Sequence, residues 1–235
     1  MSTLMRIVSA FVLTLGIFAA SMIITMVSGI HVPYIPSTFW LHTSMLVLTV
    51  FCAWVLRRKD IWPLRNVSIS FLSAVKAFLW SFLMVTISVM LFMAITTALG
   101  YEHNGKSEHF VFQTMQSWQI LLFVVIWASI AEEFLVRGLL QTMLAPLKKY
   151  SVPFFGTRIT WPVILSGIVF GLMHVGLIKT GASMLFVVQI IVVTTVLGWC
   201  AGYFREKYNS MIIAILIHAM FNMQGLLVHI LRNVD

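Results

Sequence analysis

Two adjacent carboxylates and an arginine stand inside an apolar stretch of the chain. Glu132, Glu133 and Arg137 are the charged residues of the run 117–144. An ionised group in a membrane is costly unless it faces a bundle interior or a water-filled cavity, so this group indicates a functional site. On an α-helix Glu133 and Arg137 share a face, which predicts an ion pair. Glu132 is turned about 100° away and lacks that partner, which leaves its carboxylate free to act as a general base.

Two histidines and an amide interrupt later apolar stretches. His174 follows Phe170 by four residues, so the aromatic ring is expected to pack on the imidazole. His218 and Asn222 are also four apart, which places both on one helix face, where they can donate to a developing oxyanion. Each residue alone is compatible with helix packing, but a free carboxylate, two histidines and an amide together predict a catalytic cavity. The depths in the membrane that follow from the helical rise do not decide whether these residues meet in one cavity.

The elements that carry these residues are predicted to be membrane helices. Of the 235 residues, 60% are hydrophobic and 9% are charged, against about 25% charged in a typical soluble domain. Crossing the hydrocarbon core takes about 20 mostly apolar residues. Seven runs qualify, at 4–29, 38–56, 72–99, 117–144, 161–178, 182–203 and 210–231. We therefore predict an all-α, polytopic helical membrane bundle of about seven transmembrane helices, with room for an eighth short one, forming a single membrane domain over 1–235.

The basic residues predict how the bundle is oriented, because Lys and Arg near membrane ends favour the cytoplasm. With the N-terminus in the cytoplasm, three basic residues fall on the far side: Lys106, Lys179 and Arg232. Eleven fall on the cytoplasmic side: Arg6, Arg57, Arg58, Lys59, Arg65, Lys76, Lys148, Lys149, Arg158, Arg205 and Lys207. We predict a multi-pass protein of the plasma membrane with a cytoplasmic N-terminus. Because the net charge of +8 is scattered between apolar runs, we expect no nucleic-acid partner.

Other residues that could carry chemistry are expected to serve packing or to face water. Cys52 and Cys200 both lie within hydrophobic runs, where a thiol behaves as a small apolar side chain. Four further histidines fall in predicted far-side loops or at helix ends and are expected to face water: His31, His42, His103 and His109.

The order and spacing of the polar groups resemble the CAAX protease and bacteriocin-processing family of intramembrane proteases, also called the CPBP or Abi family. The signatures of that family are EExxxR, FxxxH and HxxxN. They are met here by Glu132 and Glu133 with Arg137, by Phe170 with His174, and by His218 with Asn222. The resemblance covers about 117–231, which we expect to form the catalytic core, whereas the first three runs match only as generic membrane spans.

This resemblance implies an intramembrane endopeptidase similar to the type II CAAX prenyl endopeptidases. Glu132 and His174 would activate the attacking water, and His218 and Asn222 would stabilise the oxyanion. Glu133, Arg137 and Phe170 would organise the site. The expected substrate is a membrane-embedded or lipid-anchored protein or peptide within the lipid bilayer.

Two alternatives stay open at this level. Members of the family are commonly described as metalloproteases, and Glu132, His174 and His218 are a legitimate ligand set for a divalent metal, with zinc as the first choice. A glutamate mechanism without a cofactor uses the same residues. The alternative to an enzyme is a non-catalytic membrane protein, a peptide-binding or immunity adaptor that uses the same cavity.

Overall fold

Seven helices of this protein are long and apolar enough to cross a membrane. The computed structural model describes residues 2–56, 69–101, 111, 114–154 and 156–232, and no eighth span occurs within these ranges. The spans are α1 (Thr3–Ser28), α2 (Ser37–Val55), α3 (Phe71–Ala98), a fourth over Ser117–Gln141, a fifth over Trp161–Thr180, α8 (Met184–Tyr208) and α9 (Met211–Arg232). The predicted all-α bundle of seven spans is confirmed, with limits that differ by only a few residues.

Two spans depart from the uniform α-helix that the sequence predicts. The fourth begins as α5 (Ser117–Gln119), and the short α6 (Ser129–Glu133) separates two π-helical stretches, η2 (Ile120–Ala128) and η3 (Phe134–Gln141). Hydrogen bonds in π-helical turns join residues five apart, and such turns are frequent at functional sites. The fifth span changes from α7 (Trp161–Leu172) to the 3-10 helix η5 (Met173–Thr180). Both irregularities fall at the polar groups that the sequence singles out.

A small hairpin joins the fourth and fifth spans. After the 3-10 helix η4 (Ala145–Lys149), β1 (Ser151–Phe154) pairs antiparallel with β2 (Thr157–Thr160). Between the strands Gly156 has a φ of 74°, a conformation that glycine adopts without steric cost. The sequence predicts only a connection here, because strands of four residues with a proline in one of them carry no alternating pattern.

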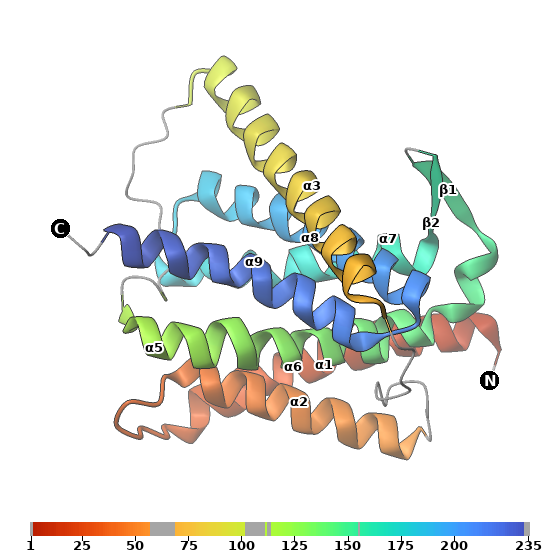
Figure 1. Ribbon diagram of the computed structural model, residues 1–235. Coiled ribbons are helices and arrows are strands. Elements are labelled where there is room, and N and C mark those ends of the chain that lie inside the picture. The colour runs from red at the N-terminus through yellow and green to blue at the C-terminus, as the bar shows by residue number, and fades with distance from the viewer. Residues whose placement is uncertain (1, 57–68, 102–110, 112–113, 155, 233–235) are drawn as a thin grey trace.

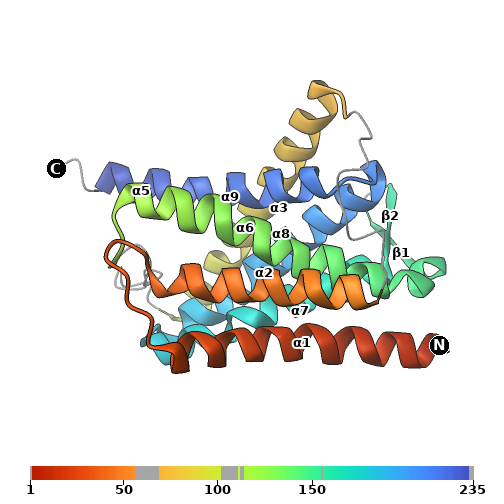
Figure 2. The same cartoon turned by 90° about the horizontal axis from the view of Figure 1, so that it is seen from below.

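The fourth span runs through the middle of the bundle. Figure 2 shows α1 and α2 on one side of it and α9 on the other. In Figure 1, α3 crosses α8 and α9 steeply, and its C-terminal part stands away from the other helices. The two chain ends lie at opposite ends of the bundle, as an odd number of crossings requires (Figures 1 and 2). The polar residues of the fourth span therefore lie between helices from both ends of the sequence.

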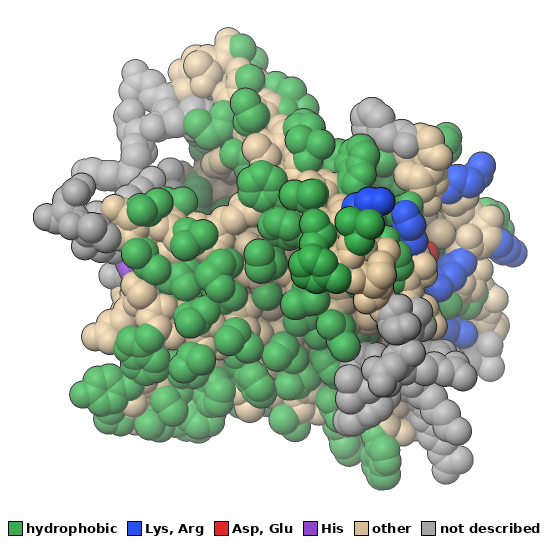
Figure 3. Space-filling view, viewed as in Figure 1, with side chains coloured by type: hydrophobic (Ala, Val, Ile, Leu, Met, Phe, Trp, Pro, Cys, Tyr) green, Lys and Arg blue, Asp and Glu red, His purple; other side chains and the backbone are tan. Residues whose placement is uncertain are grey.

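The surface is that of a multi-pass membrane protein. Apolar side chains cover the flanks of the bundle, and basic side chains collect at the end that carries the hairpin (Figure 3). At this end Arg6 donates to the carbonyl oxygens of Met143 and Thr142, at 2.8 and 2.9 Å, and Lys148 lies 3.6 Å from Glu206. Five basic residues of the predicted topology lie outside the described residues: Arg57, Arg58, Lys59, Arg65 and Lys106.

Glycines allow α7 and α8 to approach each other closely. A Cβ atom added to Gly198 would lie 2.8 Å from the Cα atom of Gly167. One added to Gly171 would lie 2.6 Å from the carbonyl oxygen of Ile191. In a membrane, where lipid is as apolar as the helices, small residues at an interface permit the contact that holds two helices together.

Gly171→Ala should therefore destabilise the bundle, because the new methyl group would force α7 away from the backbone of α8. We expect a loss of about 1–3 kcal/mol, as for overpacked cores, measured as a lower thermal unfolding midpoint in detergent. Gly16→Ala is the matched control. Gly16 lies within α1, and no neighbouring atom comes within 4 Å of the position that a Cβ atom would take, so alanine should leave the midpoint unchanged or slightly raised. Equal midpoints for the two variants would contradict the close contact.

Candidate active site

A fully buried ion pair lies at the bottom of the site. The side chains of Glu133 and Arg137 are both 0% exposed, and Oε2 of the glutamate lies 3.2 Å from Nε of the arginine. The contact lacks hydrogen-bond alignment, so it is an ion pair only. Arg137 also donates from Nη2 to the carbonyl oxygen of Gly198 at 2.8 Å, and its Cζ lies 4.8 Å from the ring centroid of Phe170. The predicted pairing is confirmed, and α7 and α8 help to hold the cation.

Phe170 packs against the charged group and both histidines. Its ring centroid lies 5.4 Å from that of His174 and 5.3 Å from that of His218, both in edge-to-face arrangements. The predicted contact with His174 is confirmed. The contact with His218 brings α9 to the same ring, so the three signatures of the sequence meet around one buried aromatic side chain.

His218 connects the ion pair to the second carboxylate. Its Nδ1 atom lies 3.1 Å from Oε1 of Glu133, and its Nε2 atom lies 3.7 Å from Oε2 of Glu132. A carboxylate accepts hydrogen bonds only, so with an ionised Glu133 the proton sits on Nδ1. The other ring nitrogen of His218 is thereby turned toward Glu132.

Glu132 lies among imidazoles rather than beside the guanidinium. Its Oε1 atom is 3.0 Å from Nε2 of His42, a residue of α2, and its Oε2 atom faces His218. His174 is also close enough to interact with it electrostatically. The carboxylate that the sequence singles out as free of Arg137 therefore contacts or faces side chains of three other spans.

His174 is held where α7 gives way to η5. Its Nδ1 atom lies 3.0 Å from the carbonyl oxygen of Phe170. A carbonyl oxygen only accepts, so Nδ1 carries the proton and Nε2 of the neutral ring carries a lone pair. This nitrogen can accept a proton.

Asn222 lies one turn from His218, but its amide group is engaged elsewhere. Its Nδ2 atom donates to the carbonyl oxygen of Val124 at 3.2 Å and to Oγ of Ser129 at 3.1 Å. Both amide protons thus tie α9 to the fourth span. The structure brings Glu132, His174 and His218 together, whereas the amide of Asn222 would have to exchange one bond to reach an oxyanion.

The expectation that His42 faces water is wrong. The residue is 9% exposed and its imidazole contacts Glu132. A signal for this existed, because His42 is the one histidine or charged residue of the run 38–56, and such residues indicate a site. His31 is exposed, as predicted, whereas His103 and His109 lie outside the described residues.

The metal alternative does not fit the side chains as they are arranged. Within the part of the chain that the structure describes, no group of three His, Cys, Asp or Glu side chains is spaced to hold a metal ion. This includes the candidate set Glu132, His174 and His218. We therefore derive no catalytic step through a metal.

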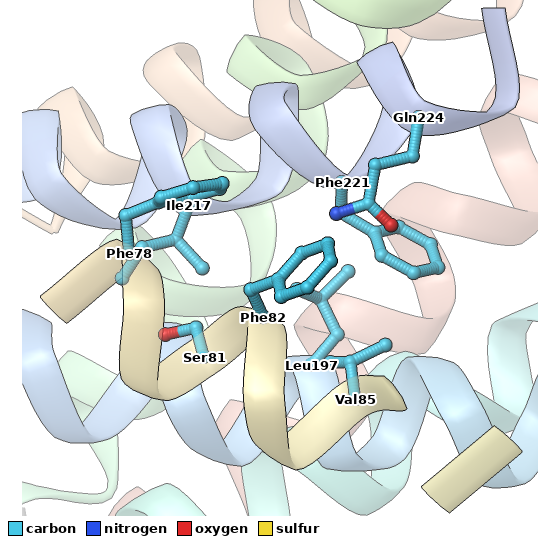
Figure 4. Close-up of a pocket in the computed structure, with 8 residues that line it drawn as sticks. All are labelled: Phe78, Ser81, Phe82, Val85, Leu197, Ile217, Phe221 and Gln224. Carbon is cyan, nitrogen blue, oxygen red and sulfur yellow. The ribbon is translucent and has the colours of Figure 1, made fainter. Parts of the chain in front are cut away.

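A small apolar pocket adjoins the site on the side of α3. It is a recess between α3, α8 and α9 with room for about one water molecule. Figure 4 shows the lining residues Phe78, Ser81, Phe82, Val85, Leu197, Ile217, Phe221 and Gln224. Leu197, Ile217 and Phe221 directly precede Gly198, His218 and Asn222 in the sequence, so the pocket and the site share α8 and α9.

A largely buried carboxylate with imidazoles from several spans of a membrane bundle is an arrangement that can carry out acid–base chemistry. The family model described as type II CAAX prenyl endopeptidase Rce1-like matches residues 114–224. This match confirms the resemblance carried by the three signatures. Residues 114–224 are thus similar to that family, which implies a protease at the general level. Neither the curated proteins nor the solved structures compared with the chain contain a match.

Replacing the buried Arg137 should lower the stability of the protein far more than replacing the partly exposed Lys148. Arg137→Gln leaves the carboxylate of Glu133 buried without its counter-charge, which we expect to cost about 3–5 kcal/mol. Lys148→Gln breaks an ion pair in which the lysine side chain is 48% exposed, and should cost less than about 1 kcal/mol. Thermal unfolding of both variants in detergent measures the difference. Similar losses would show that the buried pair does not anchor the bundle.

Proposed function

We propose that the chain is an intramembrane endopeptidase that hydrolyses a peptide bond of a membrane-associated protein or peptide. The observation that carries the proposal is the carboxylate of Glu132, enclosed by a membrane bundle and contacted by imidazoles from other spans. Peptide hydrolysis requires a group that takes a proton from water and donors that stabilise the negative oxygen of the tetrahedral intermediate. The residues around Glu132 can supply both.

In the proposed reaction Glu132 and His174 activate the water. The proton of the water passes to the carboxylate or to the free Nε2 atom of His174, and the oxygen attacks the carbonyl carbon. The C–N bond then breaks, and the same proton is delivered to the leaving nitrogen, so that the site returns to its starting state. Phe170 limits the rotation of the His174 ring by its edge-to-face contact.

His218 and Asn222 are the proposed donors to the oxyanion. His218 already uses Nδ1 toward Glu133, so donation from Nε2 requires the doubly protonated ring, with a carboxylate on each side of it. Asn222 would exchange its bond to Ser129 for one to the substrate. Glu133 and Arg137 keep their proposed role of organising the site, because they hold His218 and Phe170 in place.

The proposed setting is the plasma membrane with the N-terminus in the cytoplasm. It is supported by the basic side chains at the end that carries the hairpin, since positive residues favour the cytoplasmic side. The core at 117–231 would perform the chemistry. The adaptor alternative uses the same cavity, and it differs in needing no carboxylate at position 132.

Glu132→Gln should slow cleavage strongly, because the amide cannot take a proton from water. We expect activity to fall about 10²–10⁴-fold. Cells with equal amounts of wild-type and variant protein are compared by mass spectrometry of new peptide termini in membrane and secreted fractions. Glu206→Gln is the control, since Glu206 bonds Thr160 at 2.9 Å more than two turns of α8 beyond Gly198. Termini that persist in Glu132→Gln cells would favour the adaptor.

A further inference from the structure

One histidine outside the family match touches the carboxylate at the centre of the site. His42 belongs to α2, and its Nε2 atom lies 3.0 Å from Oε1 of Glu132. Its side chain is 11% exposed, so water does not compete freely for this contact. The matched segment, 114–224, begins well after α2. The contact therefore comes from a helix that the family match does not cover.

The chemistry of the two groups sets the direction of the hydrogen bond. An ionised carboxylate only accepts, so the proton of the bond belongs to Nε2 of His42. The other ring nitrogen, Nδ1, is buried and has no hydrogen-bond partner among the described residues. Leaving a buried polar atom without a partner costs about 1–3 kcal/mol. The imidazole of His42 thus keeps its orientation toward Glu132 even though its Nδ1 atom gains no hydrogen bond from the described residues in this orientation.

The bond determines which oxygen of Glu132 is available. With Oε1 held by His42, Oε2 is the oxygen that faces His218 at 3.7 Å, a distance too long for a hydrogen bond. A glutamate side chain has several rotatable bonds. A hydrogen bond from a fixed donor to one carboxylate oxygen restricts rotation about all of these bonds. Misplacing a reacting group by about 1 Å can cost about 100-fold in rate.

Neighbouring contacts hold α2 in register without the help of His42. The indole of Trp127, in the fourth span, donates to Oγ1 of Thr43 at 3.0 Å. One turn earlier on α2, the ring of Phe39 packs on Phe123 and Trp127 with centroids 5.4 and 5.8 Å away. Since these contacts flank His42, the helix should stay in place when the imidazole is replaced.

We propose that His42 is a positioning residue for hydrolysis, which holds Glu132 by donating a hydrogen bond to Oε1 and so directs Oε2 toward the water and the substrate. The proposal rests on the proposed function. It adds α2 to the helices that contribute to the proposed active site.

Two amides of different length test the bond. His42→Gln places an amide nitrogen near the position of Nε2 and should keep the donor, whereas the amide of His42→Asn is one methylene shorter and cannot reach Oε1. On a fluorogenic farnesylated peptide ending in a CAAX sequence, His42→Asn should lower kcat about 10–100-fold with KM within about twofold. His42→Gln should stay within about threefold of wild type. Equal kcat values for the two variants would overturn the proposal.

Two further measurements separate positioning from folding. The thermal unfolding midpoints of His42→Gln and His42→Asn should agree, and His42→Asn combined with Glu132→Gln should be no slower than Glu132→Gln alone, because the two residues act as a unit. An additive loss would overturn the proposal. Full activity in Glu132→Gln contradicts the proposed function itself, whereas loss in that variant with full activity in His42→Asn contradicts only the role of His42.

A spectroscopic signature tests the bond without substrate. The infrared band of the Glu132 carboxylate is the one lost in Glu132→Gln. It should shift in His42→Asn, where the donor is removed, and stay near its wild-type position in His42→Gln. A band that is the same in all proteins with Glu132 intact would overturn the proposal.

Discussion

Enclosing a carboxylate and a guanidinium inside an apolar bundle is the constraint on which the rest of this structure depends. Removing both groups from water is tolerated only when their mutual attraction is supplemented by other polar contacts. For Glu133 and Arg137 these come from His218, from the carbonyl oxygen of Gly198 and from the face of Phe170. The contacts belong to α9, α8 and α7. Those three helices must therefore pack in one register around the fourth span before the charges can be buried.

The features that could be predicted from the sequence are those with a local cause. Seven spans follow from runs of apolar residues, and the pairing of Glu133 with Arg137 and of Phe170 with His174 follows from a spacing of four. The partners of Asn222 could not be predicted, because they depend on how α9 lies against the fourth span. The π-helical turns also escaped prediction, since nothing in the residue types distinguishes them from α-helix.

The N-terminal helices lie outside the family match, yet they pack against the helices that carry its signature residues. α2 brings His42 to Glu132, and α3 supplies one wall of the apolar pocket. The matched segment carries most of the proposed reacting groups, while helices outside it supply part of their surroundings. Within such a bundle, the same carboxylate and imidazoles can be placed in different environments by changing helices that carry none of the signatures.

The π-helical turns also change how positions along the fourth helix are to be compared. A turn closed between residues five apart holds more residues than an α-helical turn, so each residue advances through a smaller angle around the axis. A helical wheel drawn for an α-helix would therefore place residues on either side of α6 at wrong angles around the helix axis. The error would grow with each residue of η2 and η3.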